Sequence, residues 1–320
     1  MKKWQIHQPS EEAAKQIRSS SDLSMLCAQV LAARGMHNVQ EAAAFLQCDG
    51  LADPFLTADM EAAAACINTA LDDGSRICIY GDYDCDGATA VSVGILGLQA
   101  LGAFNVSYLI PDRDKDGYGL SPQLVDRAAA AGAEFIITVD NGISSVAAVE
   151  HAKALGIETV VTDHHLPGDE IPDTLVVNPN QRGDTFPSKS LAGVGVIFYV
   201  LIAVRSALRA KGAYPNGKQP NLQHLIDLVA LGTVADVVPL DRNNRILVSK
   251  GLDSIRAGKM QPGVSALLSV AGKNAHRICA NDLGYILGPR INAAGRLDSI
   301  NKGVECLTSY DYNTALFYAK

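Results

Sequence analysis

Short apolar runs rich in β-branched residues recur along the chain between residues 76 and 178. Buried parallel strands are covered on both faces, so they give continuous apolar runs instead of the alternation typical of half-exposed strands. Five runs have this character, at 76–80, 105–110, 134–139, 158–162 and 174–178.

Helical stretches fill the gaps between these runs, at 87–101, 121–131 and 144–154. Ser121 followed by Pro122 is a typical helix start, with a capping hydroxyl and a proline in the first turn. Strands that alternate with helices are characteristic of βαβ units. The pattern predicts an α/β fold with a mostly parallel five-stranded sheet flanked by helices.

The regions on either side of this pattern look helical. Residues 1–73 are Ala-rich, carry breaks at Gly50 and Pro54, and form a predicted N-terminal helical segment. Residues 74–320 form the predicted main domain, with further helix at 191–211 and across 243–320. The final "YDYNTALFYAK" reads as a helix start without a stop signal, so we expect a piece of a longer protein.

Composition narrows the class of protein. Of 320 residues, 48% are hydrophobic, enough for a large core, and the formal charge of −7 disfavours a general affinity for polyanions. Seven cysteines without CxxC spacing indicate reduced thiols and a cytoplasmic location. The N-terminus has no apolar signal region, and no uninterrupted apolar run reaches membrane-spanning length, so no membrane association is expected.

Aspartates and histidines follow three of the five runs. Carboxyl ends of parallel strands share one sheet edge, where open α/β folds bind their ligands. Carboxylates with imidazoles and no thiolates suit Mn²⁺ or Mg²⁺, or less selectively Zn²⁺, and two such ions about 3.5–4 Å apart can promote phosphoryl transfer. The residues are Asp82, Asp84 and Asp86 after the first run, Asp140 after the third, and Asp163, His164 and His165 after the fourth.

Each of these motifs has a plainer interpretation when taken alone. The DxDxD triplet at 82–86 also fits an Asx-rich turn or a Ca²⁺ loop, and "DNG" at 140–142 is a common turn. The paired histidines at 164–165 also fit an exposed surface position. Their equivalent places in one βαβ series favour a shared metal site.

Seven motifs in order resemble the DHH phosphoesterase superfamily, and within it the bacterial single-strand-specific 5′→3′ DNA exonucleases. The resemblance covers about residues 75–320. One departure is Cys85, where many members have Ala, and the small side chain implies no loss of chemistry. The motifs are "GDYDCDG", "VDNGIS", "TDHHLPG", "SLAGVGVIFY", "LVALGTVADVVPL", "NRILV" and "GPRINAAGRLD".

The resemblance implies two divalent ions, Mn²⁺ or Mg²⁺. Asp82, Asp84 and Asp86 occupy the first motif; the sequence leaves open which of them contact metal, and we favour Asp84 and Asp86. Asp140 would bridge the ions and His164 would be a direct ligand. His165 would contact the scissile phosphate, and Asp236, in the motif "LVALGTVADVVPL", would be the last metal ligand. Asp163 is expected to support His164 from behind.

Two stretches are expected to hold DNA. The segment "SKSLAGVGV" offers hydroxyls, a lysine and glycines before a helix N-terminus, which favours anions, and "GPRINAAGR" is assigned to substrate by the resemblance. Ordinary loop and cap chemistry also fits both, and Arg113 and Tyr118 fit either the cleft or a solvated turn. The candidate residues are Ser188, Lys189, Ser190, Gly193, Arg290, Asn292 and Arg296.

The implied activity is metal-dependent hydrolysis of single-stranded DNA from its 5′ end to 5′-mononucleotides, in DNA repair and recombination. Single-strand-binding protein and a helicase are the expected partners. The resemblance also implies a DHH-associated domain and an OB-fold beyond Lys320, where aromatic stacking would help hold the strand. The alternatives are a phosphodiesterase of the same superfamily acting on short oligonucleotides, cyclic dinucleotides or pyrophosphate, and a non-catalytic scaffold.

Overall fold

The computed structural model describes residues 9–19, 21–47, 49–112, 115–297 and 300–320. The chain divides after Gly50 into two compact units, residues 1–50 and 51–320.

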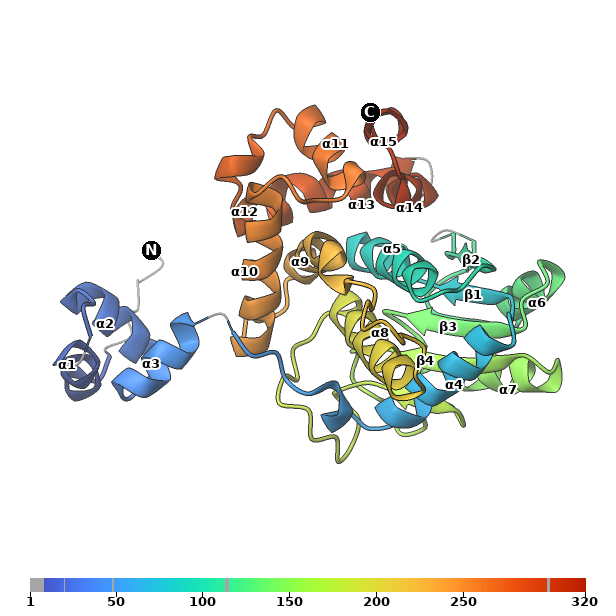
Figure 1. Ribbon diagram of the computed structural model, residues 1–320, viewed down its shortest axis with the longest axis horizontal. Helices are drawn as coiled ribbons and strands as arrows, with labels where there is room; N and C mark the ends of the chain where they lie inside the picture. The colour runs from blue at the N-terminus through green and yellow to red at the C-terminus, as the bar shows by residue number, and fades with distance from the viewer. Residues whose placement is uncertain (1–8, 20, 48, 113–114, 298–299) are drawn as a thin grey trace, which may run out of the picture. The chain divides into compact units, whose positions relative to one another are not determined.

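The larger unit contains one five-stranded, all-parallel sheet in the order β2-β1-β3-β4-β5 (Figure 1). All five strands lie within the apolar runs, so the predicted fold class and strand positions are confirmed. The strands are β1 (Ile77–Tyr80), β2 (Val106–Leu109), β3 (Phe135–Val139), β4 (Glu158–Thr162) and β5 (Leu175–Val177).

The order of the strands places a topological switch point beside β1. The chain passes from β1 to β2 on one side, then returns to β3 on the other side of β1. Connections on the two sides of a switch point run over opposite faces, which opens a crevice at the carboxyl ends of the strands. The adjacent strands β1, β3 and β4 therefore deliver their following loops to one place.

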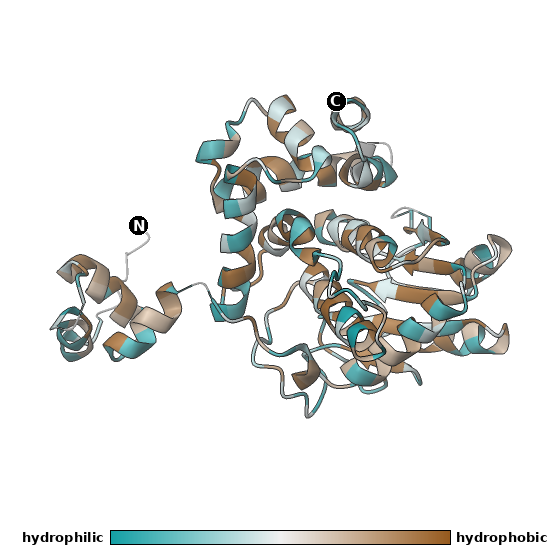
Figure 2. Ribbon diagram, viewed as in Figure 1, coloured by the Kyte–Doolittle hydropathy of each residue, from teal (hydrophilic) through white to brown (hydrophobic). Residues whose placement is uncertain are grey.

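Successive strand residues point to opposite faces, and helices cover both. Ile77 and Ile79 belong to the larger core, whereas Cys78 and Tyr80 pack with α6 and α7 on the other face. In Figure 2 the strands are correspondingly hydrophobic along their length. The helices that follow the predicted stretches are α5 (Cys85–Ala100), α6 (Pro122–Ala130), α7 (Val146–Ala154) and α8 (Gly193–Ala210); α4 (Met60–Asp72) and α9 (Ile226–Ala235) complete this layer system.

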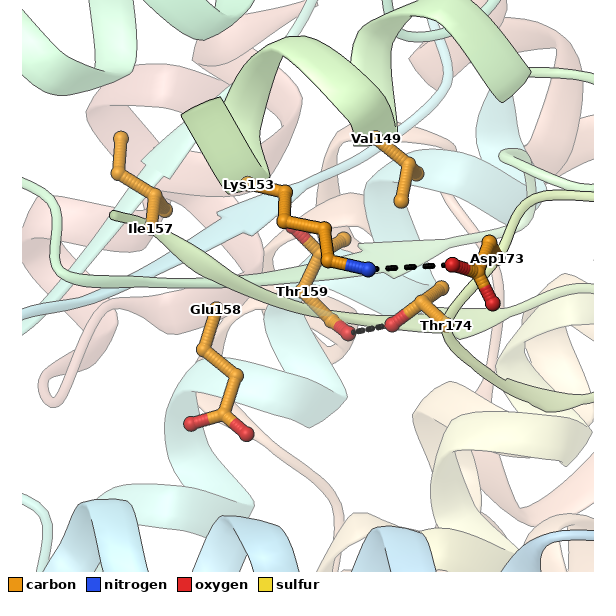
Figure 3. A pocket seen from close by; sticks show the side chains of 7 residues that line it. All are labelled: Val149, Lys153, Ile157, Glu158, Thr159, Asp173 and Thr174. Carbon is orange, nitrogen blue, oxygen red and sulfur yellow. Dashed lines mark hydrogen bonds and ion pairs between the residues drawn. The ribbon is translucent and has the colours of Figure 1, made fainter. Parts of the chain in front are cut away.

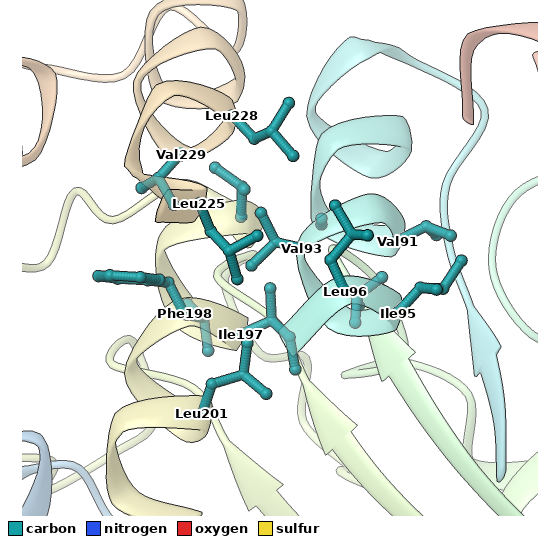
Figure 4. Close-up of a cluster of buried hydrophobic side chains, with 14 of the residues drawn as sticks. Val91, Val93, Ile95, Leu96, Ile197, Phe198, Leu201, Leu225, Leu228 and Val229 are labelled. Atoms are coloured by element: carbon teal, nitrogen blue, oxygen red, sulfur yellow. The ribbon is translucent and has the colours of Figure 1, made fainter. Parts of the chain in front are cut away.

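The packing of α5, α8 and α9 forms the centre of the core. Figure 4 shows side chains from the three helices, among them Leu96, Leu201 and Leu228, interdigitating. Among the described residues α8 alone is long and apolar enough to cross a membrane, but 67% of it is buried within the protein. We therefore describe α8 as a core helix.

Residues beyond α9 are helical, as predicted. One π-helical turn, η4, precedes α13 and packs against the end of α9, where a Cβ on Gly284 would come within 3.1 Å of Val234. The elements are α10 (Arg242–Arg256), α11 (Pro262–Val270), α12 (Ala280–Asp282), η4 (Leu283–Leu287), α13 (Gly288–Leu297), α14 (Asn301–Thr308) and α15 (Tyr312–Ala319), with short 3₁₀ turns at Leu222–Leu225 and Ala275–Arg277.

The smaller unit consists of α1 (Glu11–Ser19), α2 (Met25–Ala33) and α3 (Val39–Leu46), closed around Ile17, Ala28 and Leu31. The boundary expected after residue 73 differs from the one after Gly50 by the 3₁₀ turn η1 (Pro54–Leu56) and α4. Helix α4 packs against α8 and β5 because its Ile67 and neighbouring alanines face the larger core.

Candidate metal centre

The first aspartate motif lies between β1 and α5, and each of its carboxylates has a different surrounding. Asp84 is the N-cap of α5, and its Oδ1 accepts the Gly87 N–H at 2.9 Å. Asp82 Oδ1 accepts the Tyr83 N–H at 2.8 Å. Asp86 in the first turn is 1% exposed. The motif is thus a helix start whose three carboxylates point to separate partners.

Asp86 is held by the N-terminus of α8. Its Oδ2 accepts the Gly193 N–H at 2.6 Å and its Oδ1 accepts the Val194 N–H at 3.1 Å. Unpaired N–H groups and the macrodipole of a helix N-terminus favour an anion. The predicted anion site at this helix is therefore filled by a carboxylate of the protein itself, and each oxygen keeps a further lone pair for a cation.

Asp140 follows β3 in an unusual backbone conformation. Its φ is 62°, in the left-handed region that non-glycine residues seldom adopt, and the residue is 2% exposed. Gly193 of α8 lies directly against it: a Cβ on Gly193 would be 2.4 Å from the Asp140 Cβ. Glycine is therefore required at position 193 by the close approach of α8 to Asp140.

The two histidines after β4 have separate partners. His164 Nε2 lies 3.0 Å from Asp140 Oδ1 and 3.7 Å from Asp236 Oδ2, and its ring also hydrogen-bonds the Leu191 backbone. Asp163 Oδ1 accepts from His165 Nδ1 at 2.7 Å and from the His164 N–H at 2.7 Å. Asp163 therefore orients the ring of His165 and supports His164 through its backbone N–H, whereas the ring of His164 hydrogen-bonds the Leu191 backbone.

Asp236 is the C-cap of α9, and its Oδ2 reaches the same centre, 3.7 Å from His164 Nε2. Although His164 Nε2 approaches Asp140 at 3.0 Å, neither His164 Nε2 nor Asp236 Oδ2 makes a hydrogen bond of acceptable geometry, and both atoms are buried. Buried polar atoms are nearly always paired, so orphans here call for a missing partner.

The ligand atoms form three overlapping groups, each within 4.8 Å: Asp82, Asp84 and Asp140; Asp86, His164 and Asp236; and Asp140, His164 and His165. Oxygen and imidazole donors in this arrangement, with orphaned atoms among them, fit a divalent cation. The structure thus brings together every residue that the sequence singled out as a metal ligand.

The pKa shifts of the buried carboxylates also favour a bound cation. Burial, and then the charge of Asp84, raises the pKa of Asp82 to about 6 and that of Asp86 to about 7. Burial and then Asp86 raise the pKa of Asp140 well above its usual range and that of Asp236 to about 7. Ionised carboxylates are thus disfavoured here because they are desolvated and repel one another, and a bound cation would remove this cost.

The histidine pKa values move in opposite directions. Burial lowers the pKa of His164, outweighing the attraction of Asp236, so the neutral form that can ligate metal is favoured. The hydrogen bond that His165 donates to Asp163 raises the pKa of His165. Burial alone would raise the pKa of Asp163, but hydrogen bonds from His165 and the Ile143 N–H outweigh it and lower the value.

The residues expected to bind DNA before α8 are occupied with the protein itself. Ser188 Oγ donates to Asp241 Oδ2 at 2.6 Å. Lys189 Nζ donates to Pro179 O at 2.6 Å and to Asp184 Oδ1 at 2.8 Å. The Ser190 carbonyl accepts from Asn244. In this structure the segment fixes the start of α8.

The other predicted substrate residues lie on α13. The helix approaches the first motif, since a Cβ on Gly295 would be 3.2 Å from the Tyr83 carbonyl. Arg290 is exposed, Asn292 Oδ1 is buried without a hydrogen-bond partner, and the side chain of Arg296 lies outside the described residues, as does Arg113. At Gly295, helix α13 thus runs past Tyr83 of the first motif.

Sequence reasoning missed the ring of Tyr83 and the backbone of Leu191 as neighbours of the site, and it left Tyr118 open between the cleft and a solvated turn. Tyr118 Oη lies 3.3 Å from His165 Nδ1, and the Tyr118 ring packs edge-on against Tyr83, 6.3 Å between centroids. Leu191 contributes only its backbone, so the type of its side chain gives no indication of this role. Tyr83 lies in the motif "GDYDCDG" and Tyr118 in the stretch 112–122, so their positions beside candidate site residues were the only indication in the sequence.

A small cavity of about 150 Å³ lies at the other end of the sheet (Figure 3). Glu158 and Thr159, at the start of β4, line it, and Lys153 Nζ pairs with Asp173 Oδ2 at 3.1 Å across it. The far end of the same strand delivers His164. The cavity is therefore separate from the carboxylate centre.

Together, the all-parallel sheet and the Asp–His–His sequence after β4 define a protein of the DHH class. Residues 76–233 match the DHH family, N-terminal domain, and this part of the chain belongs to that family. The predicted family is confirmed.

Particular relatives are named single-stranded-DNA-specific exonuclease RecJ. The chain is 51% identical over 299 residues to the Salmonella typhimurium protein, covering 92% of this chain and 52% of that one. It is 49% identical over 308 residues to the Escherichia coli protein, covering 95% and 53%. The chain thus spans about half the length of these relatives.

A solved structure agrees in fold. The crystal structure of RecJ in complex with Mn²⁺ from Thermus thermophilus matches with a TM-score of 0.81 and 30% identity, over 98% of this chain and 43% of that chain. A relative therefore binds manganese, and the acidic and histidine groups of this chain are suited to a metal of that kind.

Proposed function

We propose that this chain carries the catalytic centre of a single-strand-specific 5′→3′ DNA exonuclease that releases 5′-mononucleotides. One observation carries the proposal. Two groups without a shared residue, Asp82–Asp84–Asp140 and Asp86–His164–Asp236, meet where His164 Nε2 and Asp140 Oδ1 are 3.0 Å apart. Six ligands divided in this way would suit two cations, and Asp140, which lies close to ligands of both groups, could contribute to either.

The proposed cations are Mn²⁺ or Mg²⁺. When bound, a pair of divalent ions supplies an activated water and neutralises the charge that develops on the transferred phosphoryl group. The relatives' names support DNA as substrate, and the Mn²⁺ complex of a relative supports the metal. Of the three first-motif aspartates, we assign Asp82 and Asp84 to one proposed ion and Asp86 to the other, which is supported by the grouping of their carboxylate oxygens.

The chain's own residues would prepare the phosphate for attack. Asp163 holds His165 through Nδ1 and raises its pKa, so a protonated His165 can donate from Nε2 to a phosphoryl oxygen. With 44% of its side chain exposed, His165 can reach a substrate, unlike the buried His164. Rigid supports of this kind keep the donor aligned, which lowers the entropic part of the barrier.

The test compares Asp140→Ala and Asp140→Asn with wild type on a 5′-phosphorylated single strand in Mn²⁺, with mononucleotide release as the readout. Both variants should lose at least about a thousandfold in rate, because neither side chain offers a charged bridging oxygen. Asp253→Asn, an exposed aspartate on α10, is the matched control. Near-wild-type rates for Asp140→Ala would reject the proposed centre.

Substrate choice is tested in the same assay. A long single strand, a duplex and a dinucleotide are compared at equal 5′-end concentration. We expect the single strand to be degraded fastest. Preference for the dinucleotide would replace the exonuclease proposal with a short-oligonucleotide phosphodiesterase. We further propose, from the resemblance, that the protein is cytoplasmic and acts in DNA repair and recombination. Its proposed partners are single-strand-binding protein and a helicase.

A further inference from the structure

The segment 191–194 touches three residues of the metal centre from one side. The Leu191 backbone bonds the ring of His164, the N–H groups of Gly193 and Val194 bond Asp86, and Gly193 packs against Asp140. These residues come from the ends of three strands. The position of this one segment therefore sets their mutual geometry.

The segment 191–194 is itself held from α10, fifty residues further along the chain. Asn244 Nδ2 donates to the Ser190 carbonyl, and Ser188 Oγ donates to Asp241 Oδ2 at 2.6 Å. Asp241 is the N-cap of α10, where its Oδ1 accepts the Asn244 N–H at 2.9 Å. Asn244 is fully buried, so water does not compete for these bonds.

The same amide reaches the loop that carries the last ligand. Asn244 Nδ2 also donates to the Pro239 carbonyl at 3.0 Å, and Pro239 lies in the short connection between Asp236 and α10. If the Asn244 amide were flipped, its oxygen would face two carbonyl oxygens and repel them, so the nitrogen must occupy this position. One NH₂ group thus joins the segment behind His164 and Asp86 to the loop behind Asp236.

We infer that Asn244 is a positioning residue of the metal centre: its amide sets the spacing between Asp236 and the pair Asp86 and His164, the group that would hold one cation. The inference rests on the metal centre of the proposed function. Changing a direct hydrogen-bond partner of a ligand typically lowers metal affinity about 10–100-fold, and Asn244 lies one step further out, so a loss of up to about tenfold is expected.

A neighbouring residue provides the matched control. Asn243 is also a buried asparagine in the first turn of α10, but its Oδ1 accepts from Tyr199 Oη at 2.7 Å and from the Ala52 N–H at 3.3 Å. Neither partner belongs to the 191–194 segment, although Tyr199 lies further along α8. Asn243→Ala therefore removes a comparable buried amide without releasing the segment.

The experiment titrates Mn²⁺ into the metal-free protein by calorimetry, for wild type, Asn244→Ala, Asn244→Ser and Asn243→Ala, with melting temperatures recorded for each. Asn244→Ser keeps a hydroxyl that satisfies one carbonyl and serves if the alanine variant does not fold. We expect both Asn244 variants to bind Mn²⁺ more weakly than wild type, by up to about tenfold. Asn243→Ala should melt lower yet bind as wild type does.

Two results would overturn the inference while leaving the proposed function intact: wild-type affinity in the Asn244 variants, or an equal loss in Asn243→Ala, which would indicate general destabilisation. Failure of the wild-type protein to bind Mn²⁺ would instead reject the proposed metal centre, and the inference with it.

Discussion

Asp227 is a buried carboxylate that lies outside the proposed metal centre. It stands in the first turn of α9 and is 0% exposed. Its Oδ2 accepts the Gln261 N–H at 2.6 Å, at the start of α11, while Oδ1 has no hydrogen-bond partner. Burial, only partly offset by backbone N–H donors, raises the pKa of Asp227 from 3.8 to about 7.

This raised pKa makes the stability of the fold depend on pH. Between pH 3.8 and about 7 the folded state holds a proton that the unfolded chain has released, so the free energy of unfolding falls as pH rises. Each pKa unit is worth about 1.4 kcal/mol, so roughly 3 kcal/mol is lost between pH 5 and pH 8. Above the folded pKa this loss is complete.

Asp227→Asn removes the titration while keeping the shape and one acceptor for the Gln261 N–H. The buried NH₂ that it introduces carries a cost of about 1–3 kcal/mol that does not change with pH. Relative to wild type, the variant should therefore gain about 3 kcal/mol in free energy of unfolding when pH is raised from 5 to 8.

The assay is urea denaturation followed by far-ultraviolet circular dichroism in EDTA, for both proteins at pH 5 and pH 8. The carboxylates of the metal centre titrate in the same range, but they are present in both proteins and cancel in the difference. Asp253→Asn, exposed on α10, is the control and should show no such gain. An equal difference between variant and wild type at both pH values would refute the reasoning.

Three further predictions concern packing and metal. Gly193→Ala places a Cβ 2.4 Å from the Asp140 Cβ, so it should lower both the melting temperature and the affinity for Mn²⁺. Thermal melts and calorimetry measure the two quantities, and unchanged values for both would contradict the close approach of α8 to Asp140. Gly97→Ala on α5 places a Cβ 2.2 Å from Leu201 Cδ1 of α8 and should cost about 1–3 kcal/mol in the free energy of unfolding, measured with denaturant. The cost should be smaller when the change is combined with Leu201→Ala, and strict additivity of the two changes would argue against the contact. Mn²⁺ at a hundredfold excess over its Kd should raise the free energy of unfolding by about 2.7 kcal/mol, measured with denaturant, and this gain should disappear in Asp140→Ala. A gain of the same size in both proteins would mean that the ion binds elsewhere.

Most of the fold could be predicted because its signals are local. Apolar runs such as 134–139 and the capping pair Ser121–Pro122 act over a few residues, and the structure places strand and helix there. The boundary between the two units could not be placed in this way. Helix α4 has the same Ala-rich composition as the helices before it, and its contacts with α8 and β5 assign it to the larger unit.

The ligand residues of the candidate site could also be chosen from the sequence. Asp140 and His164 each follow a strand directly, and parallel strands bring their carboxyl ends to one edge. Their roles as ligands remain predictions, whereas their convergence is seen in the structure.

What the sequence determined by itself is therefore the alternation of strands and helices and the identity of the residues at the strand ends, because both depend on neighbours in the chain. Tertiary structure alone decided that the N-terminus of α8 binds Asp86, that the Leu191 backbone orients His164, and that Asn244 ties both to the loop of Asp236. Most of these contacts join segments about 27 to 108 residues apart, and many use backbone atoms that every residue has. For this reason they cannot be predicted from the pattern of side chains along the sequence.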